Sequence, residues 1–206
     1  VRHAESMENV RVYRGDRALE RIASGRRPRC GDLLAASRLL CCQVDSPLSP
    51  EGERQLTDVR EQLLADSFEG KAGIQLVVHS TYQRAARTCA ELFGVRFPTV
   101  ALPEIVERTP WEAMTCELPF RRRLRWFRSW LAARPEERIA VVGHGFFFQN
   151  LLEGSNNSEP MANVEVRRCQ FCPVSLRFSS VEILFEPQEQ ESSDSGAAVE
   201  SFTALK

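Results

Sequence analysis

The residues whose side chains could carry out catalysis lie where strand-like runs end. The chain opens Val1-Arg2-His3-Ala4, which sets an imidazole beside a guanidinium. The planar fork of arginine matches the oxygens of a phosphate group, and an imidazole beside it can attack phosphorus because the phosphate charge is neutralised. His79 and His144 also follow apolar runs, and Arg84 comes soon after His79. This spacing predicts phosphoryl chemistry at one edge of a sheet.

Composition describes an ordinary globular protein. The chain has 206 residues, 43% of them hydrophobic, and a formal net charge of -1, so its overall charge gives no bias toward nucleic acid or membrane. Its seven cysteines are odd in number and lack framework spacing, which favours reduced thiols and a cytoplasmic location. We expect one domain over 1–186, with its first strand cut short at Val1, and a disordered tail over 187–206.

Apolar periodicity predicts the elements that would position these residues. Buried strands are expected at 74–78 and 139–142, with a weaker strand at 97–102 and a hairpin from 163–171 and 174–185. Helices are expected at 51–65, 82–93, 119–133 and 146–152, and the polar stretch 7–28 holds only a short helix at 18–23.

Alternation of strands and helices predicts a three-layer α/β/α sandwich. Its central sheet would be mostly parallel, with an antiparallel edge strand. Right-handed crossovers would bring the strand ends after Val1, Val78 and Val142 to one edge. His3, Ser80, Arg84 and His144 would then converge.

Several motifs, in this order, resemble those of the histidine phosphatase superfamily, the phosphoglycerate-mutase-like phosphoesterases. They are Arg2-His3-Ala4-Glu5-Ser6 with Asn9; Asp45-Ser46-Pro47-Leu48-Ser49 with Gly52 and Gln55; His79-Ser80-Thr81-Tyr82-Gln83-Arg84-Ala85 with Thr88; Leu102-Pro103-Glu104; and Val142-Gly143-His144. Together they cover roughly Val1 to Val166 and form a specific signal, although each alone is weak.

The resemblance implies a two-step phosphoryl transfer with no metal and no other cofactor. His3 would be the nucleophile and Glu104 the proton donor. The transferring phosphoryl oxygens would be held by four residues: Arg2, Asn9, Arg84 and His144.

The motifs differ from the family pattern at three places. Ala4 stands where the family has glycine, and Thr81-Tyr82 replaces a Pro-Leu pair. Glu104 lacks the glycine-rich turn that follows the family's acid, so Glu107 and Glu112 remain rival proton donors.

The sequence favours a metal-independent phosphomonoesterase acting on a small phosphorylated substrate, without nucleic-acid or membrane partners. Only a short loop and one helix separate Glu104 from Gly143, which leaves little chain for the long insertions of the family's mutases. A mutase-type phosphotransferase and a catalytically inactive phosphate- or phosphopeptide-binding module are the alternatives.

Three other features have ordinary interpretations: His79 as a packed residue, the arginines of 121–128 as a solvated helix face, and Cys169 and Cys172 as buried thiols.

Overall fold

A computed structural model describes residues 1–25, 27, 45–65, 68–109, 112, 118–155 and 159–187 of the chain. The expected tail lies outside these described residues from residue 188 onward.

A parallel sheet forms the centre of the molecule. Its strands are β1 (Leu76–Ser80), β2 (Thr99–Leu102) and β3 (Ile139–Val142), in the order β2-β1-β3. Both pairings are parallel, which confirms the predicted sheet type. A further parallel bridge between Arg2 and Gly143 places the N-terminal segment beside β3. The remnant before His3 therefore runs along the edge of this sheet.

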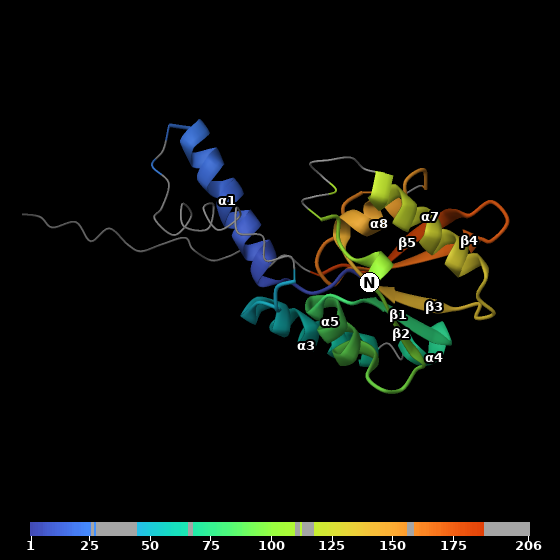
Figure 1. Cartoon of the computed structure of the whole chain (residues 1–206). Helices are drawn as coiled ribbons and strands as arrows, with labels where there is room; N and C mark the ends of the chain where they lie inside the picture. The colour runs from blue at the N-terminus through green and yellow to red at the C-terminus, as the bar shows by residue number, and fades with distance from the viewer. Residues whose placement is uncertain are drawn as a thin grey trace, which may run out of the picture.

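Helices cover both faces of the sheet (Figure 1). One face carries α3 (Pro50–Ala65), α4 (Phe68–Ala72) and α5 (Gln83–Phe93), and the other carries α7 (Leu118–Ala132) and α8 (Gly145–Leu151). Except for α4, which was not predicted, these helices and the three strands occupy the predicted segments, with bounds shifted by no more than two residues. The three-layer α/β/α architecture is thereby confirmed.

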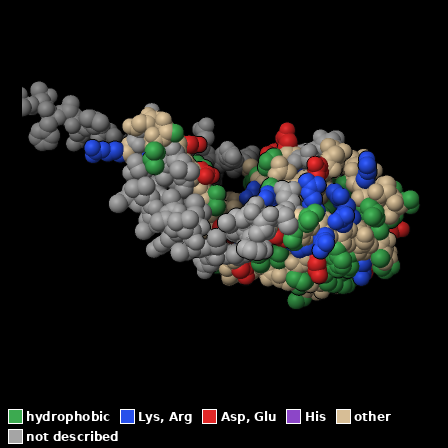
Figure 2. Space-filling model, turned by 45° about the horizontal axis from the view of Figure 1, so that its top comes forward, with side chains coloured by type: hydrophobic (Ala, Val, Ile, Leu, Met, Phe, Trp, Pro, Cys, Tyr) green, Lys and Arg blue, Asp and Glu red, His purple; other side chains and the backbone are tan. Residues whose placement is uncertain are grey.

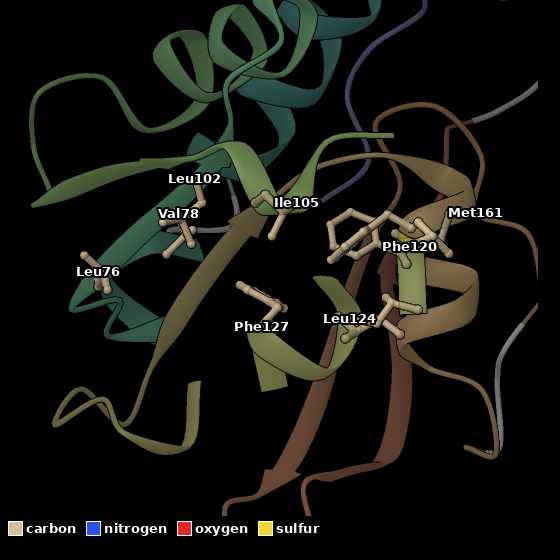
Figure 3. Packing of buried hydrophobic residues seen from close by; sticks show 11 residues of the cluster. Leu76, Val78, Leu102, Ile105, Phe120, Leu124, Phe127 and Met161 are labelled. Carbon is tan, nitrogen blue, oxygen red and sulfur yellow. The ribbon is translucent and has the colours of Figure 1, made fainter. Parts of the chain in front are cut away.

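Alternate residues of β1 belong to two different hydrophobic clusters, because successive side chains of a strand point to opposite faces. Leu76 and Val78 join the cluster that includes Phe127 of α7, and Figure 3 shows this packing. Val77 joins the cluster that includes Phe93 of α5. The central strand is thus buried on both sides, as an apolar run in a parallel sheet requires.

The predicted hairpin is present as a separate two-stranded antiparallel sheet. It consists of β4 (Val166–Cys172) and β5 (Arg177–Phe185), with irregular register near Arg167 and Cys169. The main-chain nitrogen of Arg2 donates to Glu165 O, just before β4, at 3.1 Å. The N-terminal segment therefore lies between β3 and the hairpin.

The first helix is much longer than the sequence predicted. Helix α1 spans Met7–Ala23 and projects from the body in Figure 1, whereas only a short helix at 18–23 was expected. A reciprocal capping box between Ser6 and Asn9 begins the helix. None of the α1 side chains that the structure describes is buried, and Tyr13 is 64% exposed, so hydrophobic periodicity gave no signal.

The cysteines of the hairpin are not the buried thiols expected. Cys169 is half-buried and Cys172 is exposed, and both are free. Within the described residues no group of three or more histidine, cysteine or acidic side chains could hold a metal ion. A search of these same residues also finds no helix long and apolar enough to cross a membrane.

Candidate active site

The predicted site residues meet at the carboxyl edge of the parallel sheet. Strand pairing aligns Arg2 with Gly143, His79 with Val142, and Ser80 with Leu102. His3 and His144 therefore leave the sheet at the same level, and their ring centroids lie 5.0 Å apart. The sheet topology alone explains this convergence, because parallel strands all end on one side.

His3 is held as a neutral imidazole. Its Nδ1 lies 2.6 Å from the oxygen of Ala4, and its Nε2 lies 3.2 Å from Arg84 Nε. A carbonyl oxygen can only accept and a guanidinium can only donate, so Nδ1 carries the proton and Nε2 offers its lone pair. Burial, followed by the charges of Arg84 and Arg2, holds the pKa of His3 well below its usual value. His3 therefore has an unprotonated Nε2 at neutral pH.

His144 presents an unpaired ring nitrogen inside the site. Its Nε2 lies 2.8 Å from Ser80 Oγ, but its buried Nδ1 has no hydrogen-bond partner among the described residues. Burial and the neighbouring His3 hold the pKa of His144 well below its usual value. A buried polar atom without a partner is uncommon, and a ligand oxygen beside His3 would satisfy it.

The two arginines of the site have different environments. Arg84 is only 3% exposed; its Nε donates to His3, and its Nη1 lies 3.3 Å from Glu8 Oε2. Arg2 donates from Nη1 to the oxygen of Met161, while its buried Nε has no partner among the described residues. Gly145 permits this position, because a Cβ there would lie 3.1 Å from Arg2 Nε. An oxyanion between the two guanidinium groups would gain charge-assisted hydrogen bonds.

Other motif residues hold the main chain that follows His3. Thr88 Oγ1 accepts from the nitrogen of Ala4 at 3.1 Å, and Gln55 Oε1 accepts from the nitrogen of Glu5 at 3.0 Å. Ser49 donates its main-chain N–H to the oxygen of Glu5 at 3.0 Å. The Ala4 position has no positive φ, so alanine in place of glycine causes no strain of that kind.

Gly52 permits the closest of these contacts, and we expect Gly52→Ala to destabilise the fold. A Cβ at this position would overlap the main-chain oxygen of Glu5. The backbone of α3 or of the Glu5 segment would have to move, at a cost of about 1–3 kcal/mol in the free energy of unfolding. Denaturant unfolding measures this loss. Gly70→Ala is the matched control, since a Cβ there meets nothing within 4 Å and should leave stability unchanged or slightly raised.

Comparison with known proteins agrees with this geometry. A family model described as the histidine phosphatase superfamily (branch 1) matches residues 32–118. A putative alpha-ribazole-5'-P phosphatase from Escherichia coli is 16% identical, with a TM-score of 0.58 over 89% of this chain and 92% of that chain. Residues 32–118 therefore match the histidine phosphatase superfamily, and the fold of the chain is similar to that of the phosphatase from Escherichia coli.

A second solved structure has the same fold. The mycobacterial glucosyl-3-phosphoglycerate phosphatase in complex with VO3 is 17% identical, with a TM-score of 0.54 over 90% of this chain and 97% of that chain. A search of the curated proteins gives no match. The family match contains the second, third and fourth motifs, whereas Arg2, His3 and His144 lie outside it and are brought to the site by the fold.

The three rival carboxylates occupy distinct environments. Glu112 is buried and bound by Arg123 at 2.8 Å and by the nitrogen of Thr109 at 2.9 Å, and its pKa is lowered despite burial. Among the described residues, the Glu104 carboxylate forms no hydrogen bond or ion pair. The charges of Arg84 and Arg2 lower the pKa of Glu107, whereas for Glu112 the charge that does so is that of Arg123.

Glu107 has the environment expected of a proton donor. Burial raises its pKa, while the N–H groups of Arg108 and Phe146 and the charges of Arg84 and Arg2 act in the opposite direction. The nitrogen of Arg108 donates to Glu107 Oε1 at 3.0 Å. A carboxyl group that stays protonated closer to neutral pH can protonate a leaving alkoxide.

Two other sequence predictions concern Asn9 and His79. Asn9 Oδ1 accepts from the nitrogen of Ser6 at 3.0 Å and from its hydroxyl at 2.8 Å, so this side chain caps α1. Within the described residues, no contact joins Asn9 to either arginine of the site or to His144. His79 is half-buried, and its Nδ1 lies 2.8 Å from the oxygen of Ser80. It therefore ends β1 without joining His3 and His144.

The arginine-rich helix contains one residue that sequence reasoning missed. Arg121, Arg122 and Arg125 are exposed, as a solvated face requires, and Figure 2 shows arginine and lysine side chains gathered on the side where α7 comes forward. Arg123 instead turns inward, with its side chain 17% exposed, and binds the loop that carries Glu107. A run of like residues gave no means of singling it out.

Proposed function

We propose that this protein is a metal-independent phosphomonoesterase that works through a phosphohistidine on His3. The observation that carries the proposal is the neutral, buried imidazole, whose Nε2 lone pair faces Arg84 beside the unpaired atoms Arg2 Nε and His144 Nδ1. These groups supply the nucleophile and the positive or hydrogen-bonding partners for phosphoryl oxygens. A small phosphorylated molecule is the proposed substrate, and the cytoplasm the proposed location.

The first step transfers the phosphoryl group to the enzyme. Nε2 of His3 attacks phosphorus in line, so that an N–P bond forms while the P–O bond to the leaving group breaks. Arg2 and Arg84 neutralise the charge on the equatorial oxygens, with His144 beside them. Glu107 gives its proton to the departing oxygen, and its pKa, raised by burial, suits this role.

The second step regenerates the enzyme. Glu107, now ionised, takes a proton from a water molecule that attacks the phosphohistidine. The N–P bond breaks, its electron pair returns to His3 Nε2, and inorganic phosphate leaves. The charges of Arg2 and Arg84 serve both steps, because each proceeds through a similarly charged transition state.

Hydrolysis is favoured over phosphoryl transfer between two positions of one substrate. A mutase must keep water from its phosphohistidine while the substrate reorients. Between Glu104 and Gly143 the described residues include α7 and β3, so the sequence leaves few residues there for the long insertion that would make a lid.

The test is hydrolysis of p-nitrophenyl phosphate in the presence of EDTA, and inhibition by vanadate is measured separately in metal-free buffer without EDTA, because EDTA binds vanadate. We expect turnover without added metal, and inhibition by vanadate because it becomes five-coordinate when a nucleophile binds it and then has the geometry of the transition state. Isomerisation of added phosphoglycerates faster than their hydrolysis would favour the mutase. Absence of turnover, with inorganic phosphate still raising the melting temperature, would favour the binding module.

A further inference from the structure

Arg123 binds more of the site's loop than any other side chain of α7. Its Nη1 donates to the oxygens of Glu104 at 2.7 Å and Val106 at 2.8 Å, and its Nη2 donates to the oxygen of Glu107 at 3.4 Å. Nε and Nη2 also bind the two oxygens of the Glu112 carboxylate, at 3.0 and 2.8 Å. A single guanidinium thus fixes both ends of the segment from 104 to 112.

The environment of Arg123 gives these bonds strength. The guanidinium lies over the ring of Phe120, with 5.1 Å between Cζ and the ring centroid, and Phe120 is buried in the core. Glu112 is 6% exposed and also accepts from the hydroxyl of Thr109 at 3.2 Å. Charge-assisted, two-pronged pairs of this kind are stronger and more directional than neutral hydrogen bonds. Arg123 therefore connects the loop firmly to α7.

We propose that Arg123 is a positioning residue for proton donation: it holds the Glu107 carboxyl at the distance from His3 and Arg84 at which it can protonate the leaving group. The inference rests on the proposed function. Arg123 contacts the main-chain oxygen of Glu107, while the Glu107 carboxylate accepts from the nitrogens of Arg108 and of Phe146, two residues after His144. Lysine is a point charge on a flexible stem and cannot donate to three carbonyls and a carboxylate at once, so an arginine is required.

Acid catalysis matters most when the leaving group is a poor one. The experiment is to measure kcat/KM for a series of substituted phenyl phosphates, from p-nitrophenyl to unsubstituted phenyl phosphate, in the wild type and in Arg123→Met and Arg123→Lys. We expect both variants to lose about tenfold or more on phenyl phosphate relative to p-nitrophenyl phosphate, within the range of general acid catalysis. A smaller folded fraction lowers every rate equally and leaves this ratio unchanged.

Two further variants make the test specific. Arg125→Met removes an exposed arginine from the same helix and should leave the ratio at the wild-type value. Arg123→Lys keeps a cation opposite buried Glu112, so it serves as the folded variant if Arg123→Met does not fold. Equal losses on all substrates would overturn the positioning role. Absence of turnover by the wild type would instead overturn the proposed function and, with it, this inference.

Discussion

Replacing His3 with alanine is expected to abolish hydrolysis of p-nitrophenyl phosphate, with a loss of about 10⁴-fold or more, as for removal of other enzymatic nucleophiles. His3 Nε2 is the unprotonated nitrogen that faces Arg84, whereas Nε2 of the other neutral imidazole of the site, His144, is bound to Ser80 Oγ. The arginines alone can bind phosphate, but they supply no atom that forms a bond to phosphorus.

Rapid quench with a radiolabelled substrate measures the intermediate directly. The wild type should yield a phosphoenzyme that is labile in acid and stable in base, as a phosphoramidate is, and His3→Ala should yield none. His79→Ala is the matched control, because His79 is a half-buried histidine that contacts the oxygen of Ser80 outside the site. A phosphoenzyme that survives in His3→Ala would exclude His3 as the nucleophile.

Phosphate binding should survive the loss of His3. Arg84 would lose the acceptor at its Nε but would keep the Glu8 ion pair at 3.3 Å. We therefore expect vanadate to bind His3→Ala within about tenfold of its affinity for the wild type, which is the size of one hydrogen bond to a charged group. Vanadate binding by His3→Ala therefore distinguishes the loss of the nucleophile from a loss of the structure of the site.

The sequence was sufficient to predict the parallel sheet and the residues that directly follow its strands. β3 occupies the predicted residues, because four consecutive apolar residues bounded by polar ones leave little choice. Once the strands are parallel, the positions of His3, Ser80 and His144 at one edge follow from topology. The apolar pattern of the sequence and the geometry of a parallel sheet therefore together predict where these side chains lie.

The parts that the sequence did not reveal depend on particular side-chain contacts. α1 begins at the Ser6–Asn9 capping box, although its own composition is polar. The same asparagine had been expected to bind phosphate, because the motif gives the residue type but not the partner. Arg123 looks like its neighbours in the sequence, and only its rotational position on α7 directs it inward.

The carboxyl group that we propose as the proton donor is the point on which the motif and the surroundings of the side chains differ. The motif favoured Glu104 because of its spacing from Leu102, but spacing within a loop does not fix where a side chain points. Glu107 is the carboxylate coupled to both arginines, and Glu112 is committed to Arg123. A carboxylate held by a bidentate arginine remains ionised and makes a poor acid.

Glu107→Gln is accordingly expected to lower kcat/KM for phenyl phosphate by about 10²–10³-fold, within the usual contribution of a general acid. The loss on p-nitrophenyl phosphate should be much smaller, because nitrophenolate leaves without a proton. Glu104→Gln is the isosteric comparison and should stay close to the wild type. A larger loss of kcat/KM in Glu104→Gln than in Glu107→Gln would identify Glu104 as the proton donor.

The pH profile gives an independent measurement of the same group. Burial raises the pKa of Glu107, so the carboxyl remains protonated to a higher pH than an ordinary glutamic acid. An acid must carry its proton, and kcat/KM for phenyl phosphate should therefore fall as the pH rises through this pKa. On the acidic side His3 stays neutral, since its own pKa is held well below the usual value. Glu107→Gln should remove the basic limb and leave the acidic side unchanged, because only the basic limb depends on the carboxyl proton.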